Sequence, residues 1–403
     1  MLNELIYLAK RPYHLLKTGL INGFRAEVAN NFPAKKLHVT AITGTDGKTT
    51  SATLLYHVLK EAGVRVGLLS TVAAYIGDEE IDTGFHVTSP QPSDLHEFMR
   101  RMVDQGLTHI VMEVTSHGSY QYRTWGIQPQ LAGLTNIAHE HLDYHVTYEN
   151  YLAAKTEILK KAPSVVLNED DPAYLKVRKR LGFDHTIATY AAEMPLPPAV
   201  KKAITNKFPE TYNRMNAKLV YVLAKQIGVQ DSDFAKAIDT FPGIPGRMEK
   251  IPTKKRLKLI VDFAHTPQAL QSALTTLQKN NKNGGKIIAV FGCAGLRDQT
   301  KRPEMGKIAA ELADYAVFTA EDPRTEDVWS IIRQMKEQLE TGHDKIHSIA
   351  DRYEAIEFAI NTLAQPGDTV VVLGKGHEQS MCFGTTEYPW SDKEAIVSIL
   401  DKN

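Results

Sequence analysis

A glycine turn between an apolar run and a helical stretch is the feature that most constrains the fold of this chain. Residues 41–50 read Ala-Ile-Thr-Gly-Thr-Asp-Gly-Lys-Thr-Thr and continue an apolar run that begins at Leu37. Gly44 and Gly47 let the chain turn sharply and approach a ligand closely. In such a turn the backbone N–H groups of the loop and of the helix N-terminus converge on one anion. The segment therefore predicts a phosphate-binding loop between a buried strand and a helix.

Three side chains at the end of this loop support the prediction. Lys48 supplies a mobile positive charge for phosphates, and Thr49 or Thr50 offers a hydroxyl group to Mg²⁺. The residues from Gly47 to Thr49 match the end of the standard P-loop, but Ile42 stands where that motif begins with glycine. The alternative is an ordinary glycine turn that only joins a strand to a helix.

Length and composition set the class of protein. The chain has 403 residues, which exceeds one ordinary core and predicts two or three domains. Its formal net charge is zero, so bulk charge gives no indication of nucleic-acid binding. With only two cysteines a disulfide framework is not expected, and a reducing cytoplasm is the predicted location. The sequence contains no apolar run of about 18 residues that would cross a membrane, and no signal peptide is expected.

Apolar, β-branched runs alternate with helical stretches along most of the chain. The expected strands cover 37–43, 109–114, 131–136, 164–167, 258–261, 286–291, 315–319 and 369–373. The expected helices include 51–62, 94–105, 213–227 and 267–278. Such alternation predicts an α/β fold with parallel sheets that are covered on both faces.

The expected domain boundary is the segment 241–247, which contains two prolines and two glycines. A second series of strands and helices follows it and has its own glycine turn at 292–295. Residues 3–24 show leucines at helical spacing together with basic residues. This helix is expected to pack against the central domain, and a helix lying on a membrane surface is the alternative.

A carboxylate stands where a phosphate loop needs a metal partner. Glu113 falls near the C-terminal end of the expected strand 109–114, where an unpaired carboxylate would be costly. Ligands collect at the carboxyl ends of strands in open α/β sheets. We therefore predict that Glu113 is a Mg²⁺ ligand. The alternative is a carboxylate that protein groups satisfy at the edge of the core.

The segment 135–145 is dense in histidine. A zinc-protease helix requires His-Glu-x-x-His, but the residue four positions after His139 is Asp143. His141 and His145 could share a helical face, yet no cysteine or third ligand at zinc spacing accompanies them. The sequence therefore favours His141 as a ligand of a second Mg²⁺, with the other histidines structural or lining the pocket.

Four polar groups follow expected strands in the C-terminal half, at 262–265, 292–303, 321–324 and 374–378. Because the carboxyl ends of parallel strands share one edge, these groups could face one crevice. Arginine suits bidentate binding of a carboxylate, and glutamate suits an ammonium group. Each group taken singly is also explained as a solvated loop. Lys155, in an apolar helical turn, would by its pattern alone be a solvated lysine.

These motifs in this order resemble the Mur ligases, ATP-dependent amide-forming enzymes of cell-wall peptide synthesis, and among them the tripeptide synthetases. The resemblance runs from about Leu37 to the C-terminus. It is carried by 43–50, 113–118, Gln121, Arg123, 141–145, Lys155, Asn213, Asn216, 242–249, 262–267, 301–303, 322–324, 351–352 and 374–378. It implies a central P-loop ATPase domain with a parallel sheet at 37–245 and a C-terminal Rossmann-like α/β domain at 246–403. Residues 1–36 would be a short helical remnant of the family's uridine-binding domain.

The resemblance also implies site residues. For ATP these are Gly44, Thr45, Asp46, Gly47, Lys48, Thr49, Thr50, Asn213, Asn216, Arg247 and Asp262. For the muramyl-peptide and amino-acid substrates they are Thr88, Ser89, Ser116, Gln121, Arg123, Asp322, Arg324, Gly374 and Glu378. The implied catalytic residues are Lys48, Glu113, His141 and Lys155, and the implied metal ligands are Thr49, Glu113, His141 and Lys155. The family carbamylates the lysine at the position of Lys155, which turns a cation into an anion that can hold a metal.

The activity implied by the resemblance is ATP-dependent ligation of a diamino acid to UDP-MurNAc-L-Ala-D-Glu through an acyl phosphate, with two Mg²⁺ ions. The diamino acid is meso-diaminopimelate or L-lysine; small molecules are the implied partners, and other cell-wall enzymes are further candidates. Two motifs depart from the family pattern. Glu321-Asp-Pro-Arg324 replaces Asp-Asn-Pro-Arg, and His139-Glu140 replaces Arg-Asp. The alternatives are a folylpolyglutamate-synthase-like ligase and a non-catalytic ATP-binding scaffold.

Overall fold

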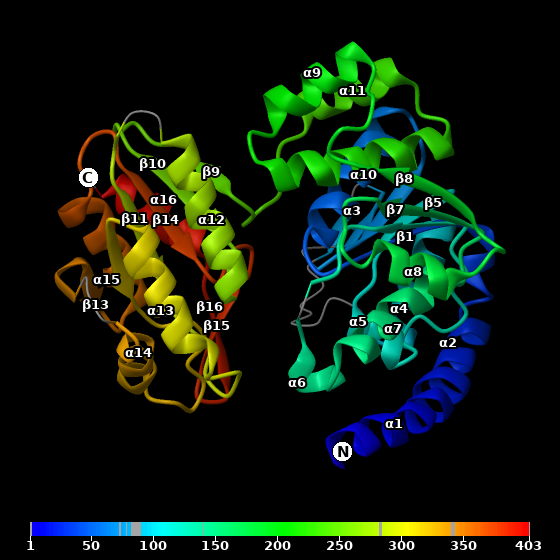
Figure 1. Cartoon of the computed structure of the whole chain (residues 1–403), viewed down its shortest axis with the longest axis horizontal. Coiled ribbons are helices and arrows are strands. Elements are labelled where there is room, and N and C mark those ends of the chain that lie inside the picture. The colour runs from blue at the N-terminus through cyan, green and yellow to red at the C-terminus, as the bar shows by residue number, and fades with distance from the viewer. Residues whose placement is uncertain are drawn as a thin grey trace. The chain divides into compact units, whose positions relative to one another are not determined.

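The chain folds into two compact units, Met1–Pro242 and Gly243–Asn403, each of which is described by itself (Figure 1). The computed structural model describes residues 2–71, 74–77, 79–81, 90–138, 140–281, 284–339 and 343–402. The two units meet in sequence inside the proline- and glycine-rich segment 241–247. In the described part of the chain, no helix is both long and apolar enough to span a membrane.

The first unit is built on an eight-stranded sheet in the order β4-β3-β2-β5-β1-β6-β7-β8. Strands β2, β5, β1, β6, β7 and β8 run parallel, and β3 with β4 forms an antiparallel edge. The strands are β1 (His38–Thr43), β2 (Val66–Leu69), β3 (Ala74–Ile76), β4 (Glu79–Ile81), β5 (His109–Glu113), β6 (Leu131–Leu134), β7 (Ser164–Asn168) and β8 (Thr186–Tyr190). The predicted parallel sheet is confirmed, with an antiparallel edge that the apolar runs did not reveal.

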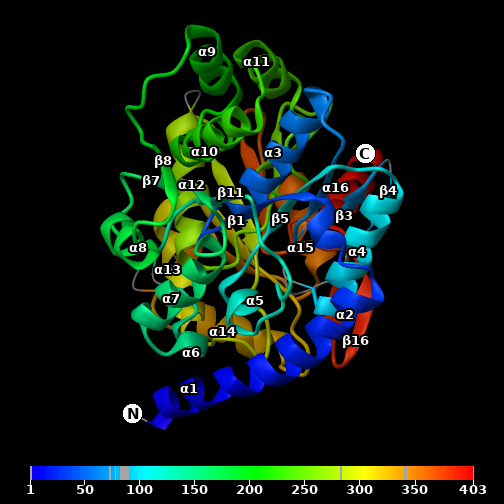
Figure 2. The same ribbon diagram turned by 90° about the vertical axis from the view of Figure 1, so that its right-hand side faces the viewer.

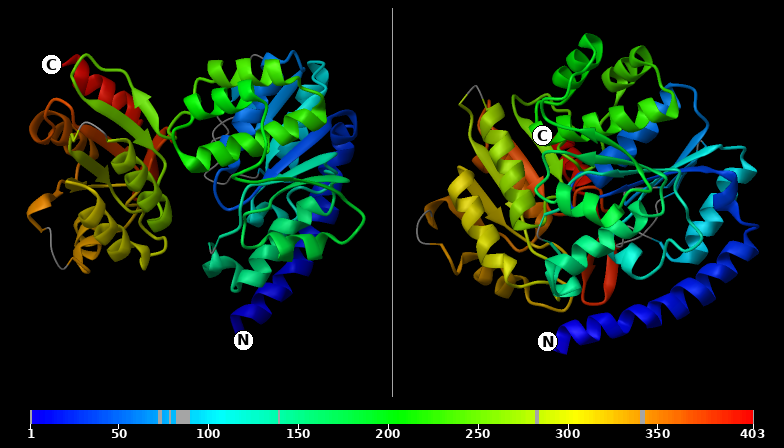
Figure 3. Two further views of the ribbon diagram at one scale, coloured as in Figure 1. Left: turned by 45° about the horizontal axis from the view of Figure 1, so that its top comes forward. Right: turned by 45° about the vertical axis from the view of Figure 1, so that its right-hand side comes forward.

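Helices cover both faces of this sheet, as Figure 1 and the left panel of Figure 3 show. One face carries α3 (Lys48–Glu61), α10 (Thr211–Ile227) and α11 (Asp231–Thr240), with α9 (Pro198–Lys207) packed on α11. The other helices are α4 (Pro92–Asp104), α5 (Ser116–Tyr120), α6 (Leu142–His145), α7 (Tyr148–Leu159) and α8 (Tyr174–Leu181). The central strands β2, β5, β1 and β6 are buried along almost their whole length, which explains why they read as continuous apolar runs.

The N-terminal segment forms α1 (Leu2–His14), a π-helical stretch η1 (Leu15–Gly23) and α2 (Phe24–Ala29), followed by the short helix η2 (Pro33–Lys36). Figure 2 shows this segment lying along the unit. The rings of Tyr7 and Tyr120 stack at 4.3 Å between centroids. A Cβ atom at Gly23 would lie 2.5 Å from Cβ of Trp125, so glycine permits the close contact. The expected helix therefore packs against the unit, while Leu16 and Phe24 remain exposed.

The second unit is built on a six-stranded sheet in the order β13-β12-β11-β14-β10-β9, parallel except for β9. Its strands are β9 (Glu249–Ile251), β10 (Lys258–Asp262), β11 (Ile287–Phe291), β12 (Tyr315–Phe318), β13 (Ile346–Ser348) and β14 (Thr369–Leu373), with a separate hairpin of β15 (Ser380–Phe383) and β16 (Thr386–Pro389). Its helices are α12 (Pro267–Asn280), α13 (Lys301–Leu312), α14 (Val328–Lys336), η3 (His343–Lys345), α15 (Arg352–Phe358), η4 (Ala359–Leu363) and α16 (Asp392–Asp401). The predicted α/β fold is confirmed here too.

Candidate active site

The glycine turn joins β1 to α3 and has a shape that only glycine permits. Gly47 is the residue before the first turn of α3 and has a φ of 76°, in the left-handed region. A Cβ atom there would lie 2.3 Å from Oδ1 of Asn216, and one at Gly44 would lie 1.8 Å from Oγ1 of Thr135. Because Gly47 has no side chain to cap α3, the first N–H groups of this helix can bind an anion.

Hydrogen bonds to neighbouring strands hold the turn in place. The backbone N–H of Thr45 donates to the carbonyl of Asn136 at 2.8 Å, and Oγ1 of Thr135 donates to the carbonyl of Asp46 at 2.6 Å. The hydroxyls of Thr45 and Tyr151 lie 2.9 Å apart. In this structure the ammonium group of Lys48 donates to the carbonyl of Thr45 at 2.6 Å. These hydrogen bonds fix the conformation of the loop, as the predicted phosphate-binding role requires.

Glu113 ends β5 directly beside this loop and is buried. Its Oε2 accepts hydrogen bonds from Oγ1 of Thr49 at 3.0 Å, from the backbone N–H of Thr71 at 3.1 Å and from Oγ1 of Thr71 at 2.9 Å. The pairing of β1 with β5, which places Ile42 opposite Glu113, sets this position. A threonine hydroxyl and a carboxylate at the end of a phosphate loop are the ligand types that Mg²⁺ takes alongside nucleotide phosphates.

Thr71 is a site residue that the sequence reasoning missed. It follows β2, the strand that pairs with β5 on the side away from β1. Its position after a buried strand at the carboxyl edge of the sheet was the available signal. Thr50, in contrast, is half-buried, and it is Thr49 whose hydroxyl reaches Glu113.

Lys155 lies on α7 and is 2% exposed, so its interpretation as a solvated lysine is wrong. Its ammonium group donates to the carbonyl of Gly44 and lies 4.6 Å from the ring centre of Tyr151. Burial, and then the charge of Lys48, lower the pKa of Lys155 well below its usual value. The structure thus holds an easily deprotonated amine against the phosphate loop.

The histidine-rich segment divides into an exposed and a buried part. His141 is exposed with a φ of 54°, and its ring centre lies 4.8 Å from that of His117. His145 is buried, with Nδ1 2.9 Å from the hydroxyl of Tyr7 and Nε2 3.0 Å from Oγ of Ser116. Burial lowers the pKa of His145 to about 3. Among the described residues, no group of three or more His, Cys, Asp or Glu side chains is placed to hold a metal ion.

Several of the predicted substrate residues surround this histidine cluster. Nε2 of Gln121 donates to the hydroxyl of Tyr144 at 2.7 Å, and Nε of Arg123 donates to Oε1 of Gln121 at 2.8 Å. Ser116 is buried against His145, as given above. The predicted residues Thr88 and Ser89 lie outside the described residues.

The two asparagines predicted to bind nucleotide lie in the first two turns of α10. Asn216 is buried and faces Gly47 of the phosphate loop. Nδ2 of Asn216 donates to Oδ1 of Asn213 at 3.5 Å, and Nδ2 of Asn213 donates to Oε2 of Glu210 at 3.2 Å. The structure therefore brings Asn216 to the loop and links Asn213 to it.

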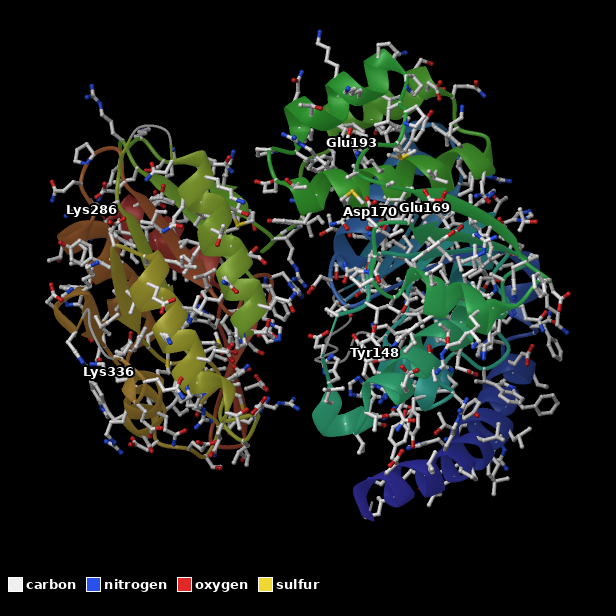
Figure 4. All side chains as sticks on the ribbon, viewed as in Figure 1. Tyr148, Glu169, Asp170, Glu193, Lys286 and Lys336 are labelled. Carbon is white, nitrogen blue, oxygen red and sulfur yellow. The ribbon has the colours of Figure 1, made fainter. Side chains whose placement is uncertain are left out.

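Acidic residues also follow β7 and β8, where Figure 4 labels Glu169, Asp170 and Glu193. Oδ2 of Asp170 accepts a hydrogen bond from the backbone N–H of Ala192 at 2.6 Å. Nζ of Lys218 donates to the carbonyl of Ala191 at 3.3 Å. These groups join the loops after two neighbouring strands, and we assign them a structural role.

In the second unit, Asp262 ends β10 and shapes the turn behind it. Its Oδ2 accepts from the backbone N–H of Met248 at 2.7 Å, and its Oδ1 accepts from that of Ala264 at 2.9 Å. Burial raises the pKa of Asp262 above its usual value, although the nearby Arg247 lowers it. The guanidinium group of Arg247 lies 4.5 Å from the ring centre of Phe263. The structure thus brings the two predicted nucleotide residues of this unit together.

The motif 321–324 and the segment 374–378 form a second cluster in this unit. Oδ1 of Asp322 accepts from Nζ of Lys375 at 2.8 Å and from the backbone N–H of Cys382 at 3.0 Å. Lys375 is fully buried and also pairs with Glu378. Nη1 of Arg324 donates to the carbonyl of Gly295 at 2.9 Å. Asp322 is therefore part of an internal ion-pair network, and Lys375 is a residue of this network that the sequence reasoning did not select.

Glu321 was likewise not selected as a site residue, and the structure singles it out. It is 6% exposed, and its Oε2 has no hydrogen-bond partner among the described residues. Burial raises the pKa of Glu321 to about 7. Gly374, with a φ of 109°, lies against it, since a Cβ atom there would be 3.2 Å from Cγ of Glu321. Buried polar groups in folded proteins nearly always have a hydrogen-bond partner, so this oxygen is an exception that a catalytic role or a bound ion would explain.

Comparisons with known proteins agree with this geometry. The family model described as Mur ligase middle domain matches residues 42–226, and the model described as Mur ligase, glutamate ligase domain, matches residues 246–376. A UDP-N-acetylmuramoyl-L-alanyl-D-glutamate–2,6-diaminopimelate ligase from Chlorobium phaeobacteroides is 35% identical, over 92% of this chain and 77% of that protein. A solved structure of a protein of that name has a TM-score of 0.62 at 28% identity, over 94% of this chain and 82% of that one.

The fold is also shared with a protein that corresponds to one of the sequence alternatives. A folylpolyglutamate synthase from Mycobacterium tuberculosis has a TM-score of 0.67 at 16% identity, over 92% of this chain and 96% of that one. At this level of identity the likeness concerns the fold alone.

Proposed function

The chain belongs to the Mur ligase family, and on that premise we propose that it ligates 2,6-diaminopimelate to UDP-N-acetylmuramoyl-L-alanyl-D-glutamate at the expense of ATP. This reaction is a step in peptidoglycan precursor synthesis. The observation that carries the proposal is the contact between Thr49 and Glu113 at the end of the phosphate loop. This contact puts a hydroxyl and a carboxylate oxygen side by side, and these are the metal-binding groups that a nucleotide–Mg²⁺ complex requires.

The first unit would activate the acceptor. Lys48 and the N-terminus of α3 would bind the ATP phosphates, and Thr49 with Glu113 would hold Mg²⁺, which neutralises charge during phosphoryl transfer. A carboxylate oxygen of the acceptor would attack the γ-phosphorus, the bond to ADP would break, and an acyl phosphate would form. Because phosphoryl transfer depends mainly on positioning and charge, a rigid cradle is what such a step needs.

Lys155 would contribute through a carbamate. Its neutral amine would attack CO₂ to form an N–C bond with loss of one proton, which leaves an anionic group where a cation stood. The lowered pKa of Lys155 supports this assignment, because only the neutral amine reacts. Together with His141, the carbamate would hold a second Mg²⁺.

The second unit would supply the diamino acid. Its amino group would attack the acyl carbon, phosphate would leave, and the amide would remain after loss of a proton. Arg324 would bind a carboxylate of the diamino acid, and Glu378 with Glu321 would bind its ammonium groups. Because Lys375 already pairs with Glu378, the incoming ammonium group would share that carboxylate. Arg247 and Asp262 would contact the nucleotide.

The substrates place the reaction in the cytoplasm, where ATP and UDP-linked precursors are made. The test is a single reaction in which the purified protein receives ATP, Mg²⁺, UDP-MurNAc-L-Ala-D-Glu and equal amounts of diaminopimelate, L-lysine and L-ornithine. Mass spectrometry should detect the diaminopimelate product with matching phosphate release, and Lys48→Ala should abolish both. A pteroyl-glutamate acceptor used in place of the muramyl peptide tests the folylpolyglutamate alternative. Ligation of that acceptor alone would refute the proposal.

A further inference from the structure

A groove of about 630 Å³ lies in the first unit between α2 and the N-terminal half of α4. Its volume is within the roughly 300–1,000 Å³ that small-molecule sites occupy. The assignments above place no group of the phosphate loop or of the histidine cluster in it. One wall belongs to the N-terminal helical segment and carries Asn22, Arg25 and Ala26, and the other belongs to α4 and carries Pro92, Glu97 and Arg100.

The two walls each contribute an arginine to the groove. Arg25 is exposed and makes no hydrogen bond or ion pair among the described residues. Arg100 pairs with Asp104 at 2.5 Å, but both side chains are about half exposed, and such pairs are weak. The guanidinium group of Arg100 is therefore available to a ligand that carries more negative charge than Asp104. Two guanidinium groups on facing walls suit a ligand with several charged oxygens, such as a diphosphate.

The N-terminus of α4 adds to this positive character. The helix has 13 residues with Pro92 at its start, and Gln91 before it makes no capping hydrogen bond through its side chain. The first N–H groups of α4 therefore have no side-chain cap, and Gln91, Pro92 and Ser93 at this end of the helix line the groove.

The remaining lining suits a nucleoside better than a bare anion. Ala26 and Pro92 are buried and form an apolar floor on which a sugar or base can rest. The amide of Asn22 can pair with the polar edge of a base, and the carboxylate of Glu97 can accept hydrogen bonds from ribose hydroxyls. A free inorganic anion would gain nothing from the apolar floor or from the amide of Asn22.

The groove also adjoins the region predicted to bind the acceptor. In the sequence, the wall residues 91–93 begin two positions after the predicted substrate residue Ser89, whose placement lies outside the described residues. The opposite wall belongs to the segment that packs on 120–127, where Gly23 meets Trp125 and Arg11 donates to the hydroxyl of Tyr122 at 3.2 Å. That stretch contains Gln121 and Arg123. Helix α4 contacts the same stretch, because Nε2 of His96 lies 3.0 Å from the backbone carbonyl oxygen of Trp125.

We propose that this groove binds the nucleoside diphosphate part of the sugar-nucleotide acceptor, with Arg25 and Arg100 as its diphosphate ligands. The identity of the acceptor rests on the function proposed above, whereas the groove itself is inferred from its own charge and lining. The site separates recognition of the nucleotide end of the acceptor from the chemistry at its peptide end.

The test measures UDP binding by isothermal titration calorimetry, with the phosphate loop saturated by a non-hydrolysable ATP analogue. Wild type, Arg25→Ala, Arg100→Ala and the double variant are compared with the matched control Arg101→Ala. Arg101 is the neighbouring arginine on α4 and instead pairs with Glu79. We expect each groove variant to raise the Kd for UDP at least tenfold and the control to leave it within twofold. Inorganic pyrophosphate and uridine, titrated separately, should each bind more weakly than UDP.

The same variants separate this inference from the proposed function. In ligation assays they should raise the KM for the UDP-linked acceptor while leaving kcat and the KM for ATP near wild-type values. An unchanged Kd for UDP in the double variant would overturn the inference even if ligation proceeds. A second outcome is that the double variant loses UDP binding while the wild-type protein ligates no muramyl peptide. This outcome would support UDP binding in the groove and contradict the proposed ligase function.

Discussion

The hydroxyl of Thr49 lies 3.0 Å from Oε2 of Glu113, although 64 positions separate the two residues. The parallel pairing of β1 with β5 brings them together, because both strands end at the same edge of the sheet. The backbone N–H and the hydroxyl of Thr71 donate two further hydrogen bonds to the same oxygen. Three donors from two residues therefore satisfy Oε2 of this buried carboxylate.

We expect Glu113→Gln to lower kcat of ligation by two orders of magnitude or more, because the amide keeps the shape but lacks the charge that binds Mg²⁺. Thr49→Val should raise the Mg²⁺ concentration for half-maximal rate about tenfold, since one ligand is lost. Steady-state rates over a Mg²⁺ series measure both. Thr53→Val, one turn further along α3 and without a hydrogen-bond partner in the described structure, is the control. A Mg²⁺ dependence for Thr49→Val equal to that of wild type would remove Thr49 from the site.

Gly47→Ala should raise the KM for ATP more than tenfold, because the new Cβ atom would meet Asn216 and the residue would keep a left-handed φ. Gly63→Ala is a matched control, since Gly63 has a φ of 80° but no atom within 4 Å of a Cβ. It should lower the free energy of unfolding by about 1 kcal/mol without affecting ATP. If both variants changed only stability, the loop would not contact nucleotide.

Lys155→Ala should be inactive, and a small carboxylate such as formate should restore part of the rate by replacing the carbamate. Wild-type activity should fall when dissolved CO₂ is removed and return when bicarbonate is added. Mass spectrometry under native conditions should detect an added 44 Da, the mass of CO₂, on the wild type and not on Lys155→Ala. Full activity of Lys155→Ala would contradict the carbamate.

The stability of the first unit should rise as the pH increases from about 4 to 6.5. His145 has a pKa of about 3 in the folded state, against an ordinary value of 6.5, so below pH 6.5 the unfolded state binds the extra proton. The contribution of His145 to the free energy of unfolding is complete above pH 6.5 and is lost as the pH falls. The loss is at most about 1.4 kcal/mol for each unit by which the folded and unfolded pKa values differ. Urea unfolding at a series of pH values measures the slope, and His145→Gln should flatten it. An identical slope in wild type and variant would show that His145 does not titrate in this way.

Glu321 should have the opposite dependence in the second unit. Its pKa of about 7 lies above the ordinary 4.5, so the folded state binds the extra proton and stability falls as the pH rises from 4.5 through 7. Glu321→Gln should unfold at higher urea than wild type at pH 8 and at similar urea at pH 4.5. Because the amide cannot bind an ammonium group, the same variant should raise the KM for the diamino acid. Asp322→Asn, which weakens the pairing with Lys375, should instead destabilise at both pH values.

Much of the fold could be predicted from the sequence, because buried parallel strands are continuous apolar runs. All eight expected strands are present, and so is the helix that follows the phosphate loop. Strands β2 and β8 were not among the expected strands, and β8 departs from a continuous apolar run because it carries partly exposed threonines. The antiparallel edge of β3 and β4 was missed because three-residue strands leave no periodic pattern.

The site residues behaved differently from the strands. Lys48, Thr49 and Glu113 could be selected because each stands at the end of an apolar run, where topology places ligands. The burial of Lys155 could not be predicted from the sequence of its helix, because alanine neighbours are compatible with both a buried and a solvated lysine. In the sequence, Thr71 and Glu321 are recognisable only as polar residues that follow a strand. Nothing in the sequence indicates the hydrogen bonds of Thr71 or the missing partner of Glu321.

The sequence alone determined the order of strands and helices, the phosphate turn and the types of group available for chemistry, because these follow from local periodicity and backbone constraints. Tertiary structure alone decided which groups meet. It buried Lys155 against Gly44 and gave Glu113 three hydrogen-bond donors. It left one oxygen of Glu321 without a donor in the part of the chain that the structure describes. Burial and pairing depend on strand order and register across long sequence separations, and these set the pKa values on which the proposed chemistry depends.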